Sequence, residues 1–497
     1  MATTDFTHSQ RQSSKGIIII FGLNTYKFIR RFFVLFVAFG LSLSKKNTFS
    51  FLSTNTLLVI IVVILLLILI FAILKYLNFK FHLTNTEFHL STGIFNKDST
   101  IIPKSKIQNV YIKQNFIQQL IDVVSLNIET AGDDKSEIEI NALDKPTALK
   151  LKRALFNKTE ISNDPQNDQI TNNVFFRVSL KRLLLEGVSQ NHFKSFAILA
   201  SFIFGLYYEF KDYLRELNID QQLENVVQLK TSSMFNILLT NSVIVLVLVV
   251  LSMLFSIVKT VITNFNLEVL DNQKTIEINK GLLNKLSLSL TPSRIQNIVI
   301  TTNRIKTYFG LYTLSVSQAM VNAKQRKNFK IIALDHLHVY QLLDKFLECY
   351  EQIENRSKPS YYFKRIMVLR MLLLVIIINT PVFLIFGNSM WWINLVLLIF
   401  CIAYVHFSYK KAYYSITENF VTIGSGFIET TTNILEIHKI QAIQIKQSVF
   451  QKRRQIASVI IMTASKAVKI PYITENDAKY INDILLYKLE SQGKDWM

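Results

Sequence analysis

The sequence predicts an α+β membrane protein in which about six transmembrane helices form three hairpins, each followed by a compact β-sheet domain with a C-terminal helix. Three observations carry this prediction: long apolar segments that come in pairs, a short motif that recurs three times at fixed spacing, and alternating apolar and polar residues between the pairs. Half of the 497 residues are apolar and the mean hydropathy is positive, which is uncommon for a soluble protein of this length.

The apolar segments have the character of membrane spans, because a bilayer core of about 30 Å requires about 20 apolar residues in a helix. They form three pairs, at roughly residues 30–77, 193–262 and 366–409. The weakest segment, 32–43, follows a basic cluster. Residues 16–28 are too polar in their surroundings for a signal peptide, so we expect an interfacial entry to the first helix.

The net charge of +20 indicates membrane topology rather than nucleic-acid binding, because the basic residues gather beside the apolar segments instead of forming one stripe. The connection at 208–230, between the third and fourth apolar segments, is acidic. Basic flanks stay in the cytoplasm, which predicts a multi-pass membrane protein with a cytoplasmic N-terminus and cytoplasmic β-sheet domains. The basic pairs are Lys152-Arg153, Lys181-Arg182, Lys364-Arg365 and Lys410-Lys411.

The recurring motif consists of a basic residue, an isoleucine and a glutamine, with a glycine 15 residues before the glutamine. Spacing kept over such a distance indicates one domain written three times, with the glycine at a hairpin turn. The copies are Lys106-Ile107-Gln108, Arg294-Ile295-Gln296 and Lys439-Ile440-Gln441, with Gly93, Gly281 and Gly426 upstream.

Each copy ends in a segment whose apolar residues have the spacing of a helix, at residues 146–156, 337–350 and 476–489. We therefore expect antiparallel strands followed by one helix. The predicted organisation is an interfacial segment with the first transmembrane pair at 17–77, a domain at 78–158, a polar linker at 159–190, the second pair at 191–262, a domain at 263–350, a linker at 351–364, the third pair at 365–409, and a domain at 410–497.

The run Ile101-Ile102-Pro103-Lys104-Ser105-Lys106-Ile107-Gln108-Asn109-Val110 resembles the signature of bacterial pleckstrin-homology-like (PH-like) membrane proteins of the YdbS/YdbT type. The second copy keeps this signature, and the third keeps its core without the proline. Residues 176–189 are similar to the segment that this family places before its second helical pair. The three units match the longer, YdbT-like members. The resemblance implies small PH-like β-barrel or sandwich domains, each closed by a helix, in a protein of the bacterial inner (cytoplasmic) membrane.

Two sets of residues are candidate sites. The shared glutamine with its basic neighbour is able to bind a lipid head group, or to bond the backbone and hold a turn, and we favour the folding role because the position recurs in all copies. Compact basic loops are candidates for contact with an anionic leaflet, where each charge adds about 1 kcal/mol, and the alternative is a solvated hairpin. These loops contain Lys324, Arg326 and Lys327, and Lys452, Arg453 and Arg454.

No phosphate loop, nucleophile elbow or zinc-protease motif occurs in the sequence, and no cofactor or metal site is expected. We therefore expect a non-enzymatic membrane scaffold whose three PH-like domains recruit proteins or sense lipid and envelope state. The alternative is a component of a transport or export system. Expected partners are anionic membrane lipid, further membrane or cytoplasmic proteins, and a second copy of the chain, but no nucleic acid.

Overall fold

The computed structural model describes residues 6–32, 54–130, 137–156, 173–216, 234–272, 275–319, 329–347, 350, 355–386 and 393–492. These residues fall into two compact units. Unit 1 comprises Met1–Asn173 with Glu277–Ser289, and unit 2 comprises Val174–Ile276 with Leu290–Met497. We call the three sequence repeats, at 78–158, 263–350 and 410–497, modules 1, 2 and 3.

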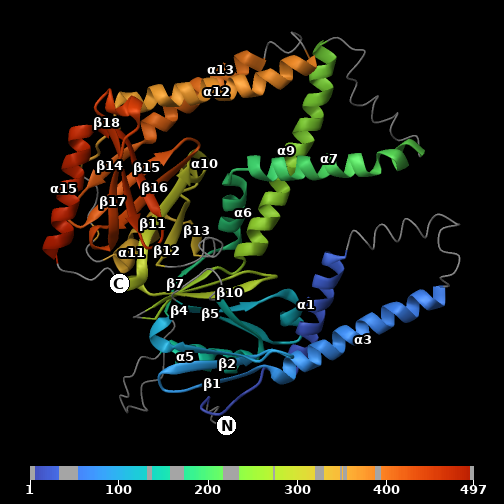
Figure 1. Cartoon of the computed structure of the whole chain (residues 1–497). Coiled ribbons are helices and arrows are strands. Elements are labelled where there is room, and N and C mark those ends of the chain that lie inside the picture. The colour runs from blue at the N-terminus through green and yellow to red at the C-terminus, as the bar shows by residue number, and fades with distance from the viewer. Residues whose placement is uncertain are drawn as a thin grey trace. The chain divides into compact units, whose positions relative to one another are not determined.

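Long helices precede each module in pairs (Figure 1). Within the described residues, two of them are long and apolar enough to cross a membrane, at Val59–Asn78 and Val245–Asn264. Their large apolar side chains are mostly exposed, as expected of helices whose solvent is lipid. The predicted segment at 32–43 lies almost wholly outside the described residues. The pairs are α1 (Gly16–Arg31) with α3 (Thr54–Asn78), α7 (Phe193–Glu216) with α9 (Met234–Asn264), and α12 (Tyr361–Phe386) with α13 (Ile393–Lys411).

In unit 1, module 1 folds into two antiparallel sheets that enclose an apolar core and are closed by a helix. Alternating residues of the strands point inward, and Phe81, Phe88 and Leu126 are almost completely buried there with Leu151 of the closing helix. The first sheet has the order β1 (Lys80–Leu83), β2 (Glu87–Thr92), β3 (Asp98–Pro103); the second contains β4 (Ile107–Gln114), β5 (Val124–Thr130) and β6 (Glu137–Leu143), and the helix is α5 (Lys145–Phe156).

In unit 2, module 3 repeats this plan, and its core contains Val459, Ile470 and Leu485. Module 2 contributes to the same unit three strands that share a sheet with strands of module 3, one short strand of another sheet, and a closing helix. The strands of module 3 are β14 (Tyr413–Ile416), β15 (Phe420–Gly426), β16 (Glu429–Glu436), β17 (Ile440–Lys446), β18 (Ile456–Thr463) and β19 (Ala467–Thr474), followed by α15 (Glu475–Gln492). Those of module 2 in unit 2 are β8 (Glu268–Asp271), β11 (Ile295–Asn303), β12 (Tyr312–Gln318) and β13 (Lys330–Leu334), followed by α11 (His336–Phe346).

The segment that precedes each helix pair hydrogen-bonds to the segment that follows the same pair. Before the first pair, Gln10 forms a β-bridge with Phe81 of β1, which follows that pair. Before the third pair, Ser357 bridges Tyr414 of β14 in the same way. Before the second pair, the backbone N–H of Val178 donates to the carbonyl of Leu267 at 3.0 Å. The chain therefore leaves and re-enters the same sheet, which fixes the base of each pair on its module.

The first helix also packs directly on module 1. A Cβ at Gly16 would lie 2.8 Å from Cβ of Ala142, and Ile19 is buried against Val123 and Ala142. Residues 16–28, for which the sequence predicts an interfacial segment, therefore begin as a helix seated on β6.

A short helix, α6 (Leu180–Ser189), connects the second helix pair to module 2. It approaches α9 so closely that a Cβ at Gly187 would lie 2.9 Å from Cα of Ile257. On its other side, Glu186 is 1% exposed and accepts a hydrogen bond from Nζ of Lys306 at 2.5 Å. Lys306 also donates to Oγ1 of Thr313 at 2.9 Å, so the buried charge pair is tied to β12.

Neighbouring modules are joined through sheet edges. In unit 1, β4 of module 1 pairs antiparallel with β10 (Lys285–Leu290), which belongs to module 2 in sequence. In unit 2, β11 of module 2 pairs antiparallel with β16 of module 3. Because main-chain hydrogen bonds run across both junctions, each forms a continuous sheet instead of a loose contact.

Candidate functional site

The recurring motif forms a corner of the fold in each module. A turn of 3-10 helix contains the basic residue, and the strand that follows begins at the isoleucine. Ile107, Ile295 and Ile440 are all at most 5% exposed, so the isoleucine is a core residue.

The glutamine lies at a β-bulge in every copy. The register shifts between Ile107 and Asn109, between Ile295 and Asn297, and between Ile440 and Ala442, so the glutamine is the extra residue each time. A bulge bends the strand and increases its twist, as the first strand after a corner requires. Gln296 is buried and Gln441 is exposed, and the side chain of Gln108 lies outside the described residues. This shared backbone role supports a folding signature over a shared ligand site.

The basic position of the motif has a different environment in each copy. Lys106 is exposed, and burial lowers the pKa of half-buried Arg294. Lys439 is buried and forms an ion pair with buried Glu436. A common phosphate-binding role would require similar exposure, which these three positions lack.

The three glycines adopt backbone angles that suit a residue without a side chain. Gly93, Gly281 and Gly426 have φ values of 107°, 108° and 131°. A Cβ on any of them would overlap a carbonyl oxygen three residues later, at 2.0 Å or less. Each lies at the end of a strand where the chain turns back, so the glycine is required by the turn geometry.

The structure describes one of the two predicted basic loops. Lys324, Arg326 and Lys327 lie outside the described residues. Lys452, Arg453 and Arg454 are exposed at the end of the short helix α14 (Val449–Lys452). Next to them, Val449 and Phe450 expose 76% and 73% of their surface, which gives this turn an apolar tip with a basic flank.

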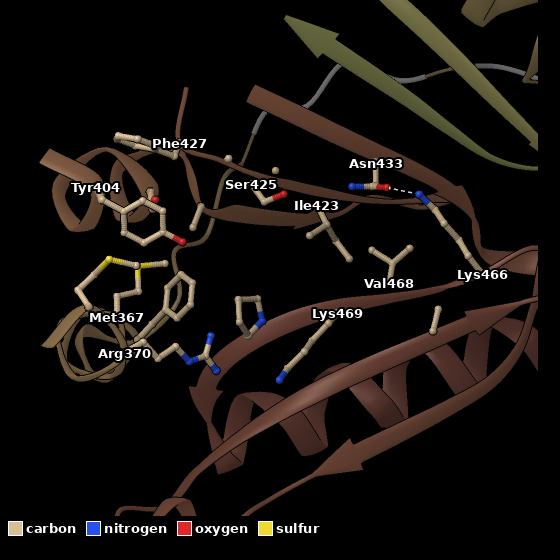
Figure 2. A pocket seen from close by; sticks show the side chains of 18 residues that line it. Met367, Arg370, Tyr404, Ile423, Ser425, Phe427, Asn433, Lys466, Val468 and Lys469 are labelled. Atoms are coloured by element: carbon tan, nitrogen blue, oxygen red, sulfur yellow. Dashed lines mark hydrogen bonds between the residues drawn. The ribbon is translucent and has the colours of Figure 1, made fainter. Parts of the chain in front are cut away.

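A pocket of about 470 Å³ lies in unit 2 between module 3 and the module-proximal ends of α12 and α13 (Figure 2). Apolar side chains from both helices and from β19 form part of its wall, among them Phe363, Met367 and Val468. The turn between β15 and β16, including Gly426, forms another part. Of the described residues predicted from the motif and the basic loops, Gly426 alone lines this pocket.

The turn is fastened to α13. The ring of Phe427 lies 5.8 Å from that of Phe400 and 5.0 Å from that of Tyr404. Nζ of Lys411 donates to the carbonyl of Phe427 at 2.6 Å. Gly424 leaves room for Tyr413, because a Cβ at that glycine would lie 2.0 Å from the ring. These contacts make the wall of the pocket a fixed surface.

Positive charge dominates the polar part of the pocket. Arg370 of α12, Lys466 and Lys469 line it, and the described lining residues include no Asp or Glu. Arg370 and Lys469 extend toward one another in Figure 2, and Arg370 donates to the hydroxyl of Tyr472 at 3.3 Å. Lys466 donates to Oδ1 of Asn433 at 2.7 Å.

Burial lowers the pKa of Lys469, and the charges of Arg370 and Lys446 lower it further. Burial is the larger cause, and the two neighbouring charges that act on this ammonium group are both repulsive. An anion bound in the pocket would relieve this repulsion. The arrangement of clustered cations beside an apolar wall therefore suits a ligand with an anionic group attached to an apolar part.

The sequence did not reveal this pocket, because its walls come from both helices of a pair and from strands far apart in the chain. One local signal was present. Gly424-Ser425-Gly426 has a second glycine that copies one and two lack, and this extra glycine is the one that admits Tyr413.

Comparison with known proteins agrees with the repeated fold. The bacterial PH domain model matches three times, at residues 31–159, 217–347 and 369–489, so the chain belongs to the bacterial PH-domain family. It is a membrane protein with three PH-like modules. The chain is similar to the transmembrane protein YdbT of Bacillus subtilis (strain 168), with 22% identity over 432 residues that cover 82% of this chain and 85% of that protein. The resemblance read from the motif is thereby confirmed.

Proposed function

We propose that the chain is a non-enzymatic scaffold of the bacterial inner membrane, in which about six transmembrane helices in three hairpins hold three PH-like modules at the cytoplasmic face. The exposed apolar surfaces of α12 and α13, together with the two helices of clear membrane-spanning character, support three spanning pairs. The sheet junctions, one within each unit, tie neighbouring modules together and support multivalent binding, which raises the effective concentration of any partner that binds several modules.

The main support for a scaffold that depends on lipid is the pocket of module 3. It opens where the module meets its helix pair, so a ligand there would be within reach of both the bilayer surface and the module. Arg370, Lys466 and Lys469 supply the attraction for a phosphate group, and the apolar wall suits the adjoining chains of a phospholipid. We therefore propose that an anionic phospholipid binds in this pocket and holds module 3 against α12 and α13.

Lipid retention tests this proposal. The full chain, purified in mild detergent and exposed to equal amounts of phosphatidylglycerol and phosphatidylcholine, is expected to retain phosphatidylglycerol selectively in native mass spectrometry. Glycerol phosphate, which carries the charge without the acyl chains, is expected to compete weakly. Equal retention of the two lipids would contradict the proposal. Sustained solute flux through vesicles that contain the chain would instead support the alternative transport function.

A further inference from the structure

The two junctions between modules follow one rule. In each, the first strand after the recurring motif pairs with the third strand of the next module. These strands are β4 with β10 in unit 1, and β11 with β16 in unit 2. Both pairs are antiparallel, so each module presents one edge to the module after it and the other edge to the module before it.

The junctions also share the same register. Ile112, five residues after the motif isoleucine Ile107, lies opposite Ser287, which is eight residues before the next motif isoleucine. Ile300, five residues after Ile295, lies opposite Thr432, which is eight residues before Ile440. An identical register at two junctions of different sequence indicates that the geometry of the modules, and not one local contact, determines the pairing.

The first and the last module each have an edge of the same kind. Within the described part of the chain, β17 of module 3 pairs with β18 alone, and β3 of module 1 pairs with β2 alone. Ala442, Gln444 and Lys446 of β17 are exposed, and Ile101 of β3 is 53% exposed. The strands in the corresponding positions, β4, β11, β10 and β16, are all covered by a neighbouring module.

We infer that β17 of one chain pairs antiparallel with β3 of a second copy, so that the pairing between successive modules continues from chain to chain. The register of the internal junctions then places Ile445 opposite Ser99 and Lys446 opposite Asp98. It also places Ile443 opposite exposed Ile101. A lysine faces an aspartate and two isoleucines face each other, which are favourable cross-strand pairs. Edge strands are usually protected from pairing, and here the protecting element is the next module.

Such a contact is heterologous, because different edges of the two copies meet. It repeats the pairing found between successive modules and requires no new type of interface. A strand from an unrelated protein would have to offer an acidic residue opposite Lys446 by chance, whereas β3 of the same chain carries Asp98 at that position in the inferred register.

Cysteine pairing between differently tagged copies tests this inference in membranes. One copy carries Gln444→Cys and the other Thr100→Cys, both with Cys349→Ala and Cys401→Ala. The inferred register places these two positions opposite one another, within the range of a disulfide. We expect an intermolecular disulfide between the two tags. The matched control replaces Thr100→Cys by Ser105→Cys, which is exposed but lies five residues away along the chain.

The charge pair provides a second readout. Lys446→Glu should lower the disulfide yield by up to about fivefold, and adding Asp98→Lys to the other copy should restore it. The inference is overturned if the Thr100→Cys yield does not exceed the Ser105→Cys yield, or if a disulfide forms only within a single chain that carries both cysteines. It is also overturned if charge reversal in the second copy gives no recovery.

Discussion

Glu186→Gln is expected to destabilise the junction between α6 and module 2 by about 3–5 kcal/mol, because it leaves the ammonium group of Lys306 buried without its counter-charge. The two side chains are 1% and 8% exposed, so water cannot replace the lost partner. Hydrogen exchange of the full chain measures the effect locally. Relative to the unmodified protein, we expect amide exchange to become faster in α6, β11 and β12 and to stay unchanged in module 1.

The repeats themselves supply the control. Lys306 occupies the third position of a short helix capped by Asn303, and the corresponding residues in modules 1 and 3 are Gln118 and Gln451. Gln118 donates to Oγ of Ser125 at 2.6 Å, as Lys306 donates to Thr313. Combining Glu186→Gln with Lys306→Gln should therefore recover much of the lost protection. A double variant as unprotected as the single variant would show that burial of the charge is not the cause.

Neutralising the pocket cations is expected to weaken anionic lipid binding by roughly a hundredfold. The variant carries Arg370→Gln, Lys466→Gln and Lys469→Gln. Each charge near an anionic head group contributes about 1 kcal/mol, and three such losses correspond to roughly two orders of magnitude in Kd. The measurement is the Kd of the full chain for phosphatidylglycerol at fixed ionic strength, since exposed charges are screened by salt.

The matched control removes the same charge from the surface of the same module, through Lys452→Gln, Arg453→Gln and Arg454→Gln. These side chains lie outside the pocket. If they provide the lipid contact that the sequence suggests, this control will lose at least as much affinity as the pocket variant, and the pocket will not be the principal site. A much larger loss in the pocket variant supports the assignment.

The sequence predicted those parts of the fold that repeat or that depend on local pattern. The helices that close the modules begin within one residue of the predicted positions, and Asp335 caps α11 by accepting from the backbone N–H of His338. The turn glycines were recognisable because a positive φ selects glycine at the same place in each copy.

The parts of the fold and of the site that the sequence did not predict depend on contacts between distant segments. The sheet junctions join β4 to β10 and β11 to β16, and one sequence does not specify which edges will meet. Nor does it reveal that Glu186 faces Lys306, although the change from glutamine to lysine in copy two was a visible clue. The pocket was missed because its cations come from α12 and from the turn and strand around β19, each unremarkable within its own segment.

The binding position of an anionic lipid tests the central claim most directly. The full chain in vesicles that contain a trace of photoactivatable phosphatidylglycerol would be irradiated, digested and mapped by mass spectrometry. The proposal predicts labelled peptides from residues 363–371 and from 424–427 or 466–469, and loss of this labelling in the variant that lacks the three pocket cations. Labelling confined to the exposed apolar faces of α3 and α9, or labelling of the pocket peptides that persists in that variant, would contradict it.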